Sequence, residues 1–192
     1  MTAEALERRR ARTRAEILDA AWVLCHEQGL AQLSLRDLAA RVGMRAPSLY
    51  SYFDSKDAIY DAMFAQGQHQ LSEHMAFLPD DGLTREDFRA GARAFFTFCT
   101  SDPTRYQLLF QRVLPGFTPS AASYGLAVAH LERLEAQMAS VGVTDPRHRD
   151  LWTAVLTGLT DQQIANDPGG DRWERLLDEA VDLFCDHAGI PH

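Results

Sequence analysis

Residues 34–56 read SLRDLAARVGMRAPSLYSYFDSK, and this stretch decides the fold. Ser34 can accept a backbone hydrogen bond at the start of a helix, and Asp37, three residues later, can return one, which makes a capping box. Gly43 follows where a left-handed residue ends a helix without a Cβ penalty. The pattern therefore predicts a short helix over 35–42.

A second short helix is predicted over 47–53, because Pro47 has a fixed φ that suits the first turn of a helix. Only three residues separate Gly43 from this proline, and Ala39 supplies a small side chain where two steeply crossing helices approach most closely. This geometry is typical of a helix-turn-helix, which inserts its second helix into the major groove of DNA. An ordinary helical hairpin is the alternative for the pattern alone.

Two segments resemble the tetracycline-repressor (TetR) family. Residues 43–57 are similar to its recognition-helix signature, in which Leu-Tyr is followed by Tyr/His-Phe and then by a Ser/Asn/Thr-Lys that opens a long fourth helix. Residues 13–21, TRAEILDAA, resemble the family's first helix. The two segments span about the first third of the chain. Pro47 stands where the family often has a small residue, which bears on the base contacts but not on the docking mode.

Charge is distributed unevenly along the chain. The total is -8, yet residues 1–56 carry nine basic and seven acidic side chains, a net +2, which leaves -10 for the remainder. This asymmetry fits a DNA-facing module on a body that polyanions repel. The arginines between Arg8 and Arg14 are open to two interpretations: a frayed, solvated arm, or an arm that contacts phosphates or the minor groove.

The chain reads as an ordinary cytoplasmic protein that does not enter the membrane. It has 46% hydrophobic residues but no apolar run of the length, about 18 residues, that a membrane span needs, and its N-terminus is charged where a signal peptide would be apolar. Cys25, Cys99 and Cys185 are widely spaced, so buried thiols are expected rather than disulfides or a zinc site, with a redox sensor as the alternative.

The fold class expected is all-α, with nine helices and no strand alternation. Start signals are two kinds of cap: the pairs Thr13/Glu16, Thr84/Asp87 and Asp171/Glu174, and the dipeptides Asp102-Pro103, Thr118-Pro119 and Asp145-Pro146. The predicted helices are 14–28, 35–42, 47–53, 55–77, 85–100, 103–113, 119–141, 146–165 and 172–187. We expect a helix-turn-helix DNA-binding domain over 1–54 and a ligand-binding and dimerisation domain over 55–192.

The candidate DNA contacts lie in and around the second short helix. The N-terminal residues of such a helix face base edges, so the expected readers are Arg45, Ala46, Pro47 and Ser48. Arg45 can reach a guanine or only a phosphate, whereas Ala46 and Pro47 offer apolar surface to a thymine methyl. The family resemblance implies phosphate contacts from Ser34, Tyr50, Tyr52 and Lys56. The alternatives are a core aromatic for Tyr50 and a solvated cap for Lys56.

The resemblance also implies a ligand cavity among the fourth to eighth helices. The expected lining residues, all on those helices, are Phe95, Cys99, Tyr106, Phe110, Tyr124, Val128 and Trp152, which would suit a hydrophobic or aromatic small molecule. The simpler interpretation of these aromatics is a packed core. His69, His74 and His130 are available polar anchors, but their spacing does not match metal ligation, and neither a metal nor a cofactor is expected.

Dimerisation is implied by the same resemblance, through a four-helix bundle of the last two long helices of each subunit. The expected interface residues follow two helical stripes: Leu151, Val155, Gly158 and Leu159 on the eighth helix, and Leu176, Leu177, Ala180, Val181 and Phe184 on the ninth. A homodimer would read two half-sites of a palindromic operator in double-stranded DNA, separated by about 34 Å or a multiple of it.

The sequence therefore favours a homodimeric regulator of transcription, a repressor that a small-molecule ligand releases from its operator. A second hypothesis keeps DNA binding but assigns the C-terminal domain to a protein partner. An enzyme is not favoured, because we find no nucleophile-base constellation, phosphate loop or metal-ligand spacing.

Overall fold

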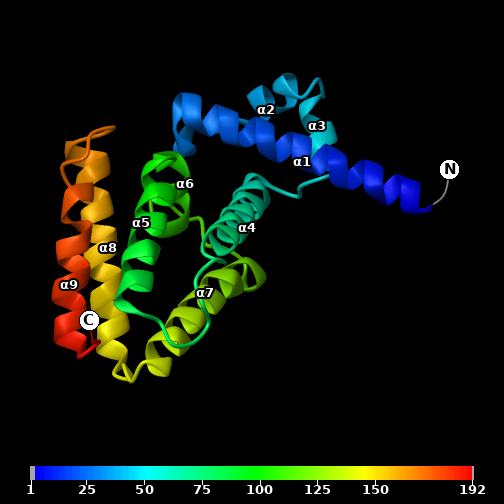
Figure 1. Ribbon diagram of the computed structural model, residues 1–192. Helices are drawn as coiled ribbons and strands as arrows, with labels where there is room; N and C mark the ends of the chain where they lie inside the picture. The colour runs from blue at the N-terminus through cyan, green and yellow to red at the C-terminus, as the bar shows by residue number, and fades with distance from the viewer. Residues whose placement is uncertain (1–2, 192) are drawn as a thin grey trace. The chain divides into compact units, whose positions relative to one another are not determined.

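The computed structural model describes residues 3–191, which form α-helices, 3₁₀ turns and loops with no strand. Figure 1 shows the helices, whose order and bounds are α1 Ala3–Gln28, α2 Leu35–Arg41, α3 Ala46–Leu49, α4 Lys56–His74, α5 Arg85–Thr100, α6 Pro103–Phe110, α7 Ala121–Ser140, α8 Pro146–Asn166 and α9 Leu177–Ala188. The 3₁₀ turns are η1 Leu30–Gln32 and η2 Glu174–Leu176. The all-α prediction with nine helices is confirmed for these residues. None of their helices is long and apolar enough to cross a membrane.

Three predicted helix caps are present. The Thr84 hydroxyl accepts the Asp87 N–H at 3.2 Å while the Asp87 carboxylate accepts the Thr84 N–H at 2.8 Å, a complete capping box at the start of α5. Asp102 accepts the Arg105 N–H at 2.9 Å, and Asp145 accepts the Arg147 N–H at 2.9 Å. These local signals are reliable because each cap satisfies donors that the first helical turn leaves unpaired.

The predicted start of the first helix at residue 14 is wrong. Helix α1 already begins at Ala3, so Thr13 and Glu16 lie inside it rather than at its cap. Ion pairs one turn apart, Arg8–Glu4 and Arg12–Glu16, support this N-terminal extension. The arginine-rich segment is therefore helical and not a frayed arm.

The predicted cap of the last helix at Asp171 is also wrong, since α9 begins at Leu177 after η2. Side chains from the end of α8 hold the intervening backbone: the Gln163 amide oxygen accepts the Trp173 N–H at 3.0 Å, and Asp167 accepts the Arg172 N–H at 2.9 Å. These bonds fix a turn where a helix was expected.

Helix α7 begins at Ala121 rather than at Pro119. Ser120 is its cap, because its hydroxyl accepts the Ser123 N–H at 3.2 Å, and the Asp61 carboxylate fixes Ser120 by accepting its N–H at 2.7 Å. The ends of the remaining helices lie within about four residues of the predicted ones, the usual scatter of helix boundaries.

The chain divides into two compact units. The first consists of residues 3–67 and 107–124, and Ile17, Leu38, Leu49, Ile59 and Met63 are among the residues that fill its core. Gly67 on α4 allows close packing in this unit, because a Cβ there would lie 2.9 Å from the Leu109 side chain.

The second unit consists of residues 68–106 and 125–191. Aromatic rings are central to its core: Trp152 lies 5.5 Å from Phe88 and 4.8 Å from Phe184, between ring centroids. Edge-to-face and tilted arrangements of this kind add stability beyond the burial of apolar area.

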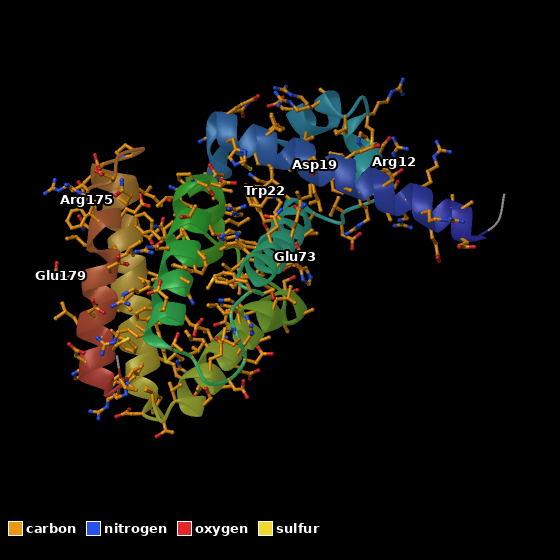
Figure 2. All side chains as sticks on the ribbon, viewed as in Figure 1. Arg12, Asp19, Trp22, Glu73, Arg175 and Glu179 are labelled. Atoms are coloured by element: carbon orange, nitrogen blue, oxygen red, sulfur yellow. The ribbon has the colours of Figure 1, made fainter. Side chains whose placement is uncertain are left out.

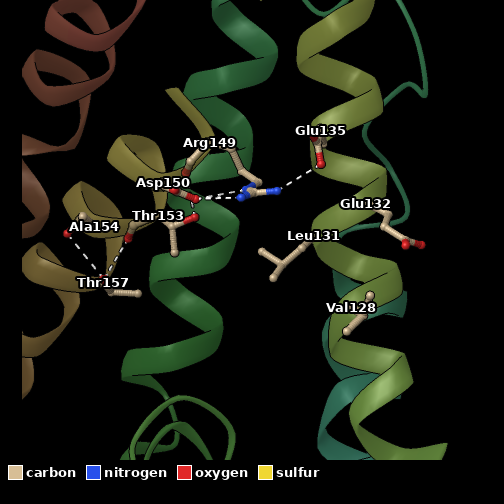
Figure 3. A pocket seen from close by; sticks show the side chains of 9 residues that line it. All are labelled: Val128, Leu131, Glu132, Glu135, Arg149, Asp150, Thr153, Ala154 and Thr157. Carbon is tan, nitrogen blue, oxygen red and sulfur yellow. Dashed lines mark hydrogen bonds and ion pairs between the residues drawn. The ribbon is translucent and has the colours of Figure 1, made fainter. Parts of the chain in front are cut away.

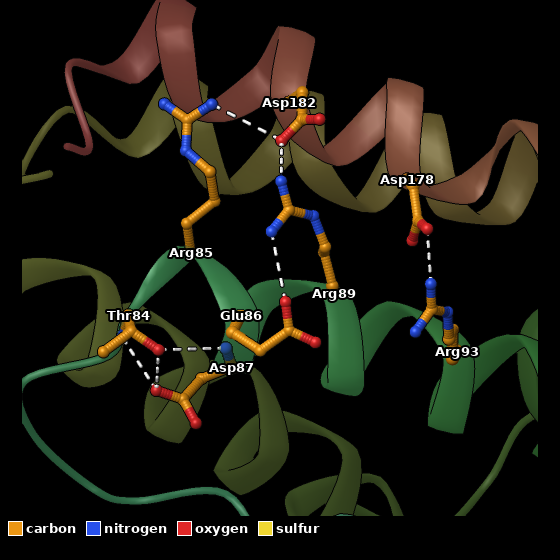
Figure 4. A network of polar contacts seen from close by, with 8 residues as sticks. All are labelled: Thr84, Arg85, Glu86, Asp87, Arg89, Arg93, Asp178 and Asp182. Atoms are coloured by element: carbon orange, nitrogen blue, oxygen red, sulfur yellow. Dashed lines mark hydrogen bonds and ion pairs between the residues drawn. The ribbon is translucent and has the colours of Figure 1, made fainter. Parts of the chain in front are cut away.

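A ladder of ion pairs joins α5 to α9 along one side of that core (Figure 4). Arg85, only 5% exposed, donates to Asp186 at 2.6 Å, while Asp182 accepts from Arg89 at 2.5 Å. Arg93 pairs with Asp178 one turn further on. The spacing of one helical turn between rungs sets the register of the two helices.

All three cysteines are free and buried, as predicted. Burial raises the pKa of Cys25 to about 11 and that of Cys99 to about 12. Thiols of this kind stay protonated at neutral pH and are poor nucleophiles.

Candidate functional site

Helix α2 begins at Ser34, whose backbone is extended and whose hydroxyl accepts the Asp37 N–H at 3.4 Å. The expected forward half of the cap is therefore present. Ser34 is partly exposed, so the N-terminal end of α2, with its free backbone amides, is accessible to an anion.

The turn between α2 and α3 is a Schellman motif centred on Gly43, which has a φ of 68°. The Met44 N–H donates to the Ala39 carbonyl at 2.8 Å, and the Gly43 N–H donates to the Ala40 carbonyl at 3.1 Å. This closure needs a left-handed residue, which explains the glycine. Ala39 is 1% exposed, consistent with its expected role as a small contact residue.

Helix α3 is a single turn that turns most of its side chains outward. Arg45, Pro47 and Ser48 are exposed, while Leu49 is 1% exposed and anchors the helix in the core of the first unit. The chain continues as a turn through residue 52 rather than as a longer helix, with the Tyr52 N–H donating to the Leu49 carbonyl at 2.8 Å. The expected base readers thus form one outward-facing group, with Ala46 partly buried beside them.

The expected phosphate contacts border this group. Tyr50 is 55% exposed, which rules out the core-aromatic interpretation, and Tyr52 is half-buried. Lys56, the first residue of α4, is partly exposed; its Nζ lies 3.4 Å from the Ala31 carbonyl oxygen and 5.4 Å from the Tyr60 ring centroid. These contacts position the ammonium beside the helix-turn-helix without enclosing it.

The sequence alone did not reveal that two arginines of α1 hold the segment after α3. Arg10 donates to the Ser51 carbonyl at 2.8 Å, and Arg14 donates to the Tyr52 carbonyl and lies over the Phe53 ring. Arg12, labelled in Figure 2, pairs instead with Glu16 on the same helix and remains exposed. The spacing of Arg10 and Arg14, one helical turn apart, places both on one face of α1 but does not identify their main-chain partners.

The expected ligand-lining residues are divided between the two units of the chain. Cys99, Tyr106 and Trp152 are buried, with the Tyr106 hydroxyl donating to Asp161 at 2.9 Å and Trp152 in the aromatic core. Phe95 packs against that core, whereas Phe110 and Tyr124 are exposed and belong to the first unit. Val128 lines an open groove between α7 and α8.

The expected interface residues fall into two groups. Leu177, Val181 and Phe184 are buried in the core of their own unit, so they are unavailable to a partner, and their assignment to an interface is corrected. Leu151 and Leu176 are exposed to 41% and 38%, Gly158 is exposed, and Val155, Leu159 and Ala180 are partly exposed. Leu183, which the sequence reasoning missed, is 66% exposed beside them on α9.

Two short helices joined by a glycine turn, with Arg45, Pro47 and Ser48 exposed at the start of the second, define a helix-turn-helix protein that binds DNA. The comparisons with known proteins agree. Residues 17–63 match the family model for bacterial regulatory proteins of the tetR family. The chain belongs to the TetR family of transcriptional regulators, and it is a DNA-binding regulator of transcription rather than an enzyme.

Related proteins support this assignment along most of the chain. The transcriptional repressor KstR2 of Rhodococcus jostii is 29% identical over 155 residues, which cover 80% of this chain and 69% of KstR2. The crystal structure of the regulatory protein SCO4313 has a TM-score of 0.78 at 22% identity and covers 94% of this chain and 98% of that one. FadR of Bacillus subtilis, solved with stearoyl-CoA, has a TM-score of 0.69 at 18% identity over 88% of this chain and 96% of that one. The likeness to the two structures concerns the fold.

Proposed function

We propose that this regulator is a homodimeric repressor that binds a palindromic operator and is released from it by a small-molecule ligand. The observation that carries DNA recognition is the outward-facing first turn of α3, where Arg45, Pro47 and Ser48 are exposed while Leu49 anchors the helix. In this fold such residues face base edges in the major groove.

The chemistry of each side chain indicates whether it would read bases or bind phosphates. Arg45 carries a fork of donors that matches the O6 and N7 acceptors of guanine, and Ser48 can donate or accept. Tyr50, Tyr52 and Lys56, together with the amides at Ser34, would hold phosphates and so set the register. Since Ala46 and Pro47 offer only apolar surface, DNA shape would contribute to specificity.

Dimerisation would use the exposed stripe of α8 and α9. Leu151, Val155 and Gly158 recur at helical spacing on α8, and Leu176 at the end of η2 is followed at the same spacing by Ala180 and Leu183 on α9. An apolar stripe of this kind is covered in a helical bundle, and an isologous pairing of the two helices gives a twofold dimer. Two linked DNA-binding domains gain affinity on a palindrome through effective concentration.

Repression and release by a ligand are supported by relatives. FadR was solved with stearoyl-CoA, and KstR2 is a repressor. We assign DNA binding to residues 1–54 and ligand binding and dimerisation to residues 55–192, and we expect the protein to act in the cytoplasm on operator DNA. A ligand would shift DNA affinity only by its differential affinity for the two states of the dimer.

The test is binding to the DNA upstream of the chain's own gene, measured by fluorescence anisotropy against a shuffled duplex of equal composition. At near-physiological salt we expect the upstream DNA to bind at least about a thousandfold more tightly. Equal affinity for both duplexes would contradict the proposal that the protein represses transcription by specific binding at that site. Specific binding that no small molecule weakens would favour the alternative function, in which residues 55–192 bind a protein partner instead of a ligand.

A further inference from the structure

An open groove of about 540 Å³ lies between α7 and α8 in the second unit (Figure 3). Its lining residues on α7 recur at intervals of three and four, so they share one face of that helix. The residues are Val128, Leu131, Glu132 and Glu135 on α7, and Arg149, Asp150, Thr153, Ala154 and Thr157 on α8. The volume is in the range of sites that hold small organic molecules.

The groove has an apolar part. Leu131 is 39% exposed and points from α7 toward α8 in Figure 3, and Val128 and Ala154 contribute further apolar surface. The Thr153 hydroxyl donates to the Arg149 carbonyl at 2.9 Å, and the Thr157 hydroxyl donates to the Thr153 carbonyl at 2.7 Å. Because both hydroxyl protons are used within α8, neither threonine offers a donor to a ligand.

The polar part of the groove offers acceptors. Arg149 donates to Glu135 at 3.0 Å and to Asp150 at 2.9 Å, so its guanidinium is held by a carboxylate on each side. Each carboxylate retains further lone pairs. Glu132 stands exposed at the rim and has no ion-pair partner within residues 3–191; an exposed side chain of this kind exchanges rotamers within nanoseconds.

Charge reinforces this preference. Three carboxylates line the groove against one guanidinium, in a chain whose net charge is -8. A carboxylate or phosphate group of a ligand would meet three carboxylates and a guanidinium that is already paired with two of them, whereas a cationic group would meet a net negative charge.

We propose that the groove binds an amphiphilic organic cation, with an ammonium group among Glu132, Glu135 and Asp150 and an apolar tail along Leu131 and Val128. This inference rests on the proposed ligand-responsive function and specifies its effector. The groove occupies a different face of α8 from Leu151, Val155 and Gly158, so one helix carries both the ligand contacts and the stripe assigned to the dimer.

Isothermal titration calorimetry of the full chain tests the ligand class. The ligands are n-octyltrimethylammonium, n-octanol and octanoate, which share a tail and differ in charge, each below its micelle concentration. We expect the cation to bind at least about tenfold more tightly than the alcohol, a difference of about 1.4 kcal/mol, and octanoate to bind more weakly still. Failure of the cation to bind, or octanoate binding as tightly as the cation, would overturn the proposal.

A charge-reversal variant tests the location. Glu132→Lys should weaken binding of n-octyltrimethylammonium about tenfold, because it replaces an attraction by a repulsion at the rim. The matched control is Glu73→Lys on α4, labelled in Figure 2, which makes the same change at an exposed residue that does not line the groove. If both variants lost the same affinity for n-octyltrimethylammonium, the loss would reflect the overall charge of the chain, and the groove would be rejected as the binding site.

Operator binding separates this inference from the proposed function. If n-octyltrimethylammonium binds in the groove without weakening operator binding, the site stands and its role as effector site fails. If the operator is bound specifically but no cation binds, the groove inference fails while DNA recognition stands.

Discussion

The guanidinium carbon of Arg14 lies 4.1 Å from the centre of the Phe53 ring, and its side chain also donates to the Tyr52 carbonyl. Arg14 is in the middle of α1, whereas Phe53 follows the turn after α3. The contact therefore fixes the exit of the recognition helix against the first helix. Arg10 acts in the same way one turn earlier through the Ser51 carbonyl.

Arg14→Ala is expected to lower the free energy of unfolding of the first unit by about 1–3 kcal/mol, because it removes a cation-π contact and a charged hydrogen bond in a partly buried position. Urea denaturation measures the change. Arg12→Ala is the control, since Arg12 is exposed and, among the described residues, pairs with Glu16 on its own helix; we expect a change within about 0.5 kcal/mol.

The same variant distinguishes positioning from direct contact with DNA. If Arg14 only positions α3, Arg14→Ala weakens operator binding and leaves the dependence of log affinity on log salt unchanged. A decrease of about 0.9 in that slope would show that Arg14 neutralises a phosphate, contrary to this expectation.

Lys56 and Arg45 should differ in how their loss affects recognition. Lys56→Ala is expected to weaken binding to all sequences alike and to reduce the salt slope by about one per subunit, because the proposed role of this ammonium is to contact phosphate. Arg45→Ala is expected to cost about 1–3 kcal/mol at a single base position. Anisotropy titrations on operators with single-base changes measure both, and uniform losses for Arg45→Ala would remove it from base reading.

The sequence predicted the helix ends and caps that depend only on residues within a few positions along the chain. Gly43 ends α2 because only local backbone geometry is involved, and the caps at Thr84 and Asp145 are satisfied within their own first turns. The anchoring of Arg14 was not predictable, because its partners lie 38 and 39 residues away and a main-chain carbonyl leaves no mark in the sequence. The false cap at Asp171 has the same origin, since α8 holds that segment.

Sequence periodicity identified the amphipathic helices but not which apolar stripe faces solvent. The bulky stripe of α9, with Val181 and Phe184, packs into its own core, and the stripe with Ala180 and Leu183 remains exposed. Burial drives both kinds of packing, so a core stripe and an interface stripe have the same period. The same reason explains why the aromatic residues expected around a ligand have different environments: Trp152 is buried in the core, whereas Phe110 and Tyr124 are exposed.

Acidification should destabilise the second unit through His130 on α7. Burial lowers the pKa of His130 below its ordinary value of 6.5, and the charge of Arg133 lowers it further. Because the folded-state pKa is the lower one, the stability conferred by neutral His130 is fully present above pH 6.5 and is lost as the pH falls through the folded-state pKa. Urea denaturation between about pH 7.5 and 5 should show a slope of at most about 1.4 kcal/mol per pH unit from this residue.

His130→Gln is expected to remove that part of the pH dependence. His69→Gln on α4 is the control, because His69 is exposed. An unchanged slope in His130→Gln, or the same change in both variants, would assign the pH dependence to other groups.

Gly158 offers the most selective test of the proposed dimer. Apart from the backbone of its own helix, a Cβ at this position would have no atom of the described residues within 4 Å, so the fold of one chain accommodates a side chain there. Gly158→Ala should raise the free energy of unfolding of the isolated subunit by about 1 kcal/mol, the usual cost of glycine within a helix. Gly158→Arg should leave the fold intact but convert the dimer to a monomer, because a charged side chain would then have to be buried at the interface.

Light scattering coupled to size-exclusion chromatography measures the oligomeric state of Gly158→Arg. The matched control is Gly125→Arg on α7, where a Cβ also meets no atom within 4 Å and no expected interface residue is affected. The control should remain dimeric and retain its affinity for the palindrome, whereas Gly158→Arg should bind the palindrome no more tightly than a single half-site. If Gly158→Arg stays dimeric, the subunits pair through another face, and the stripe on α8 and α9 is free for a different partner.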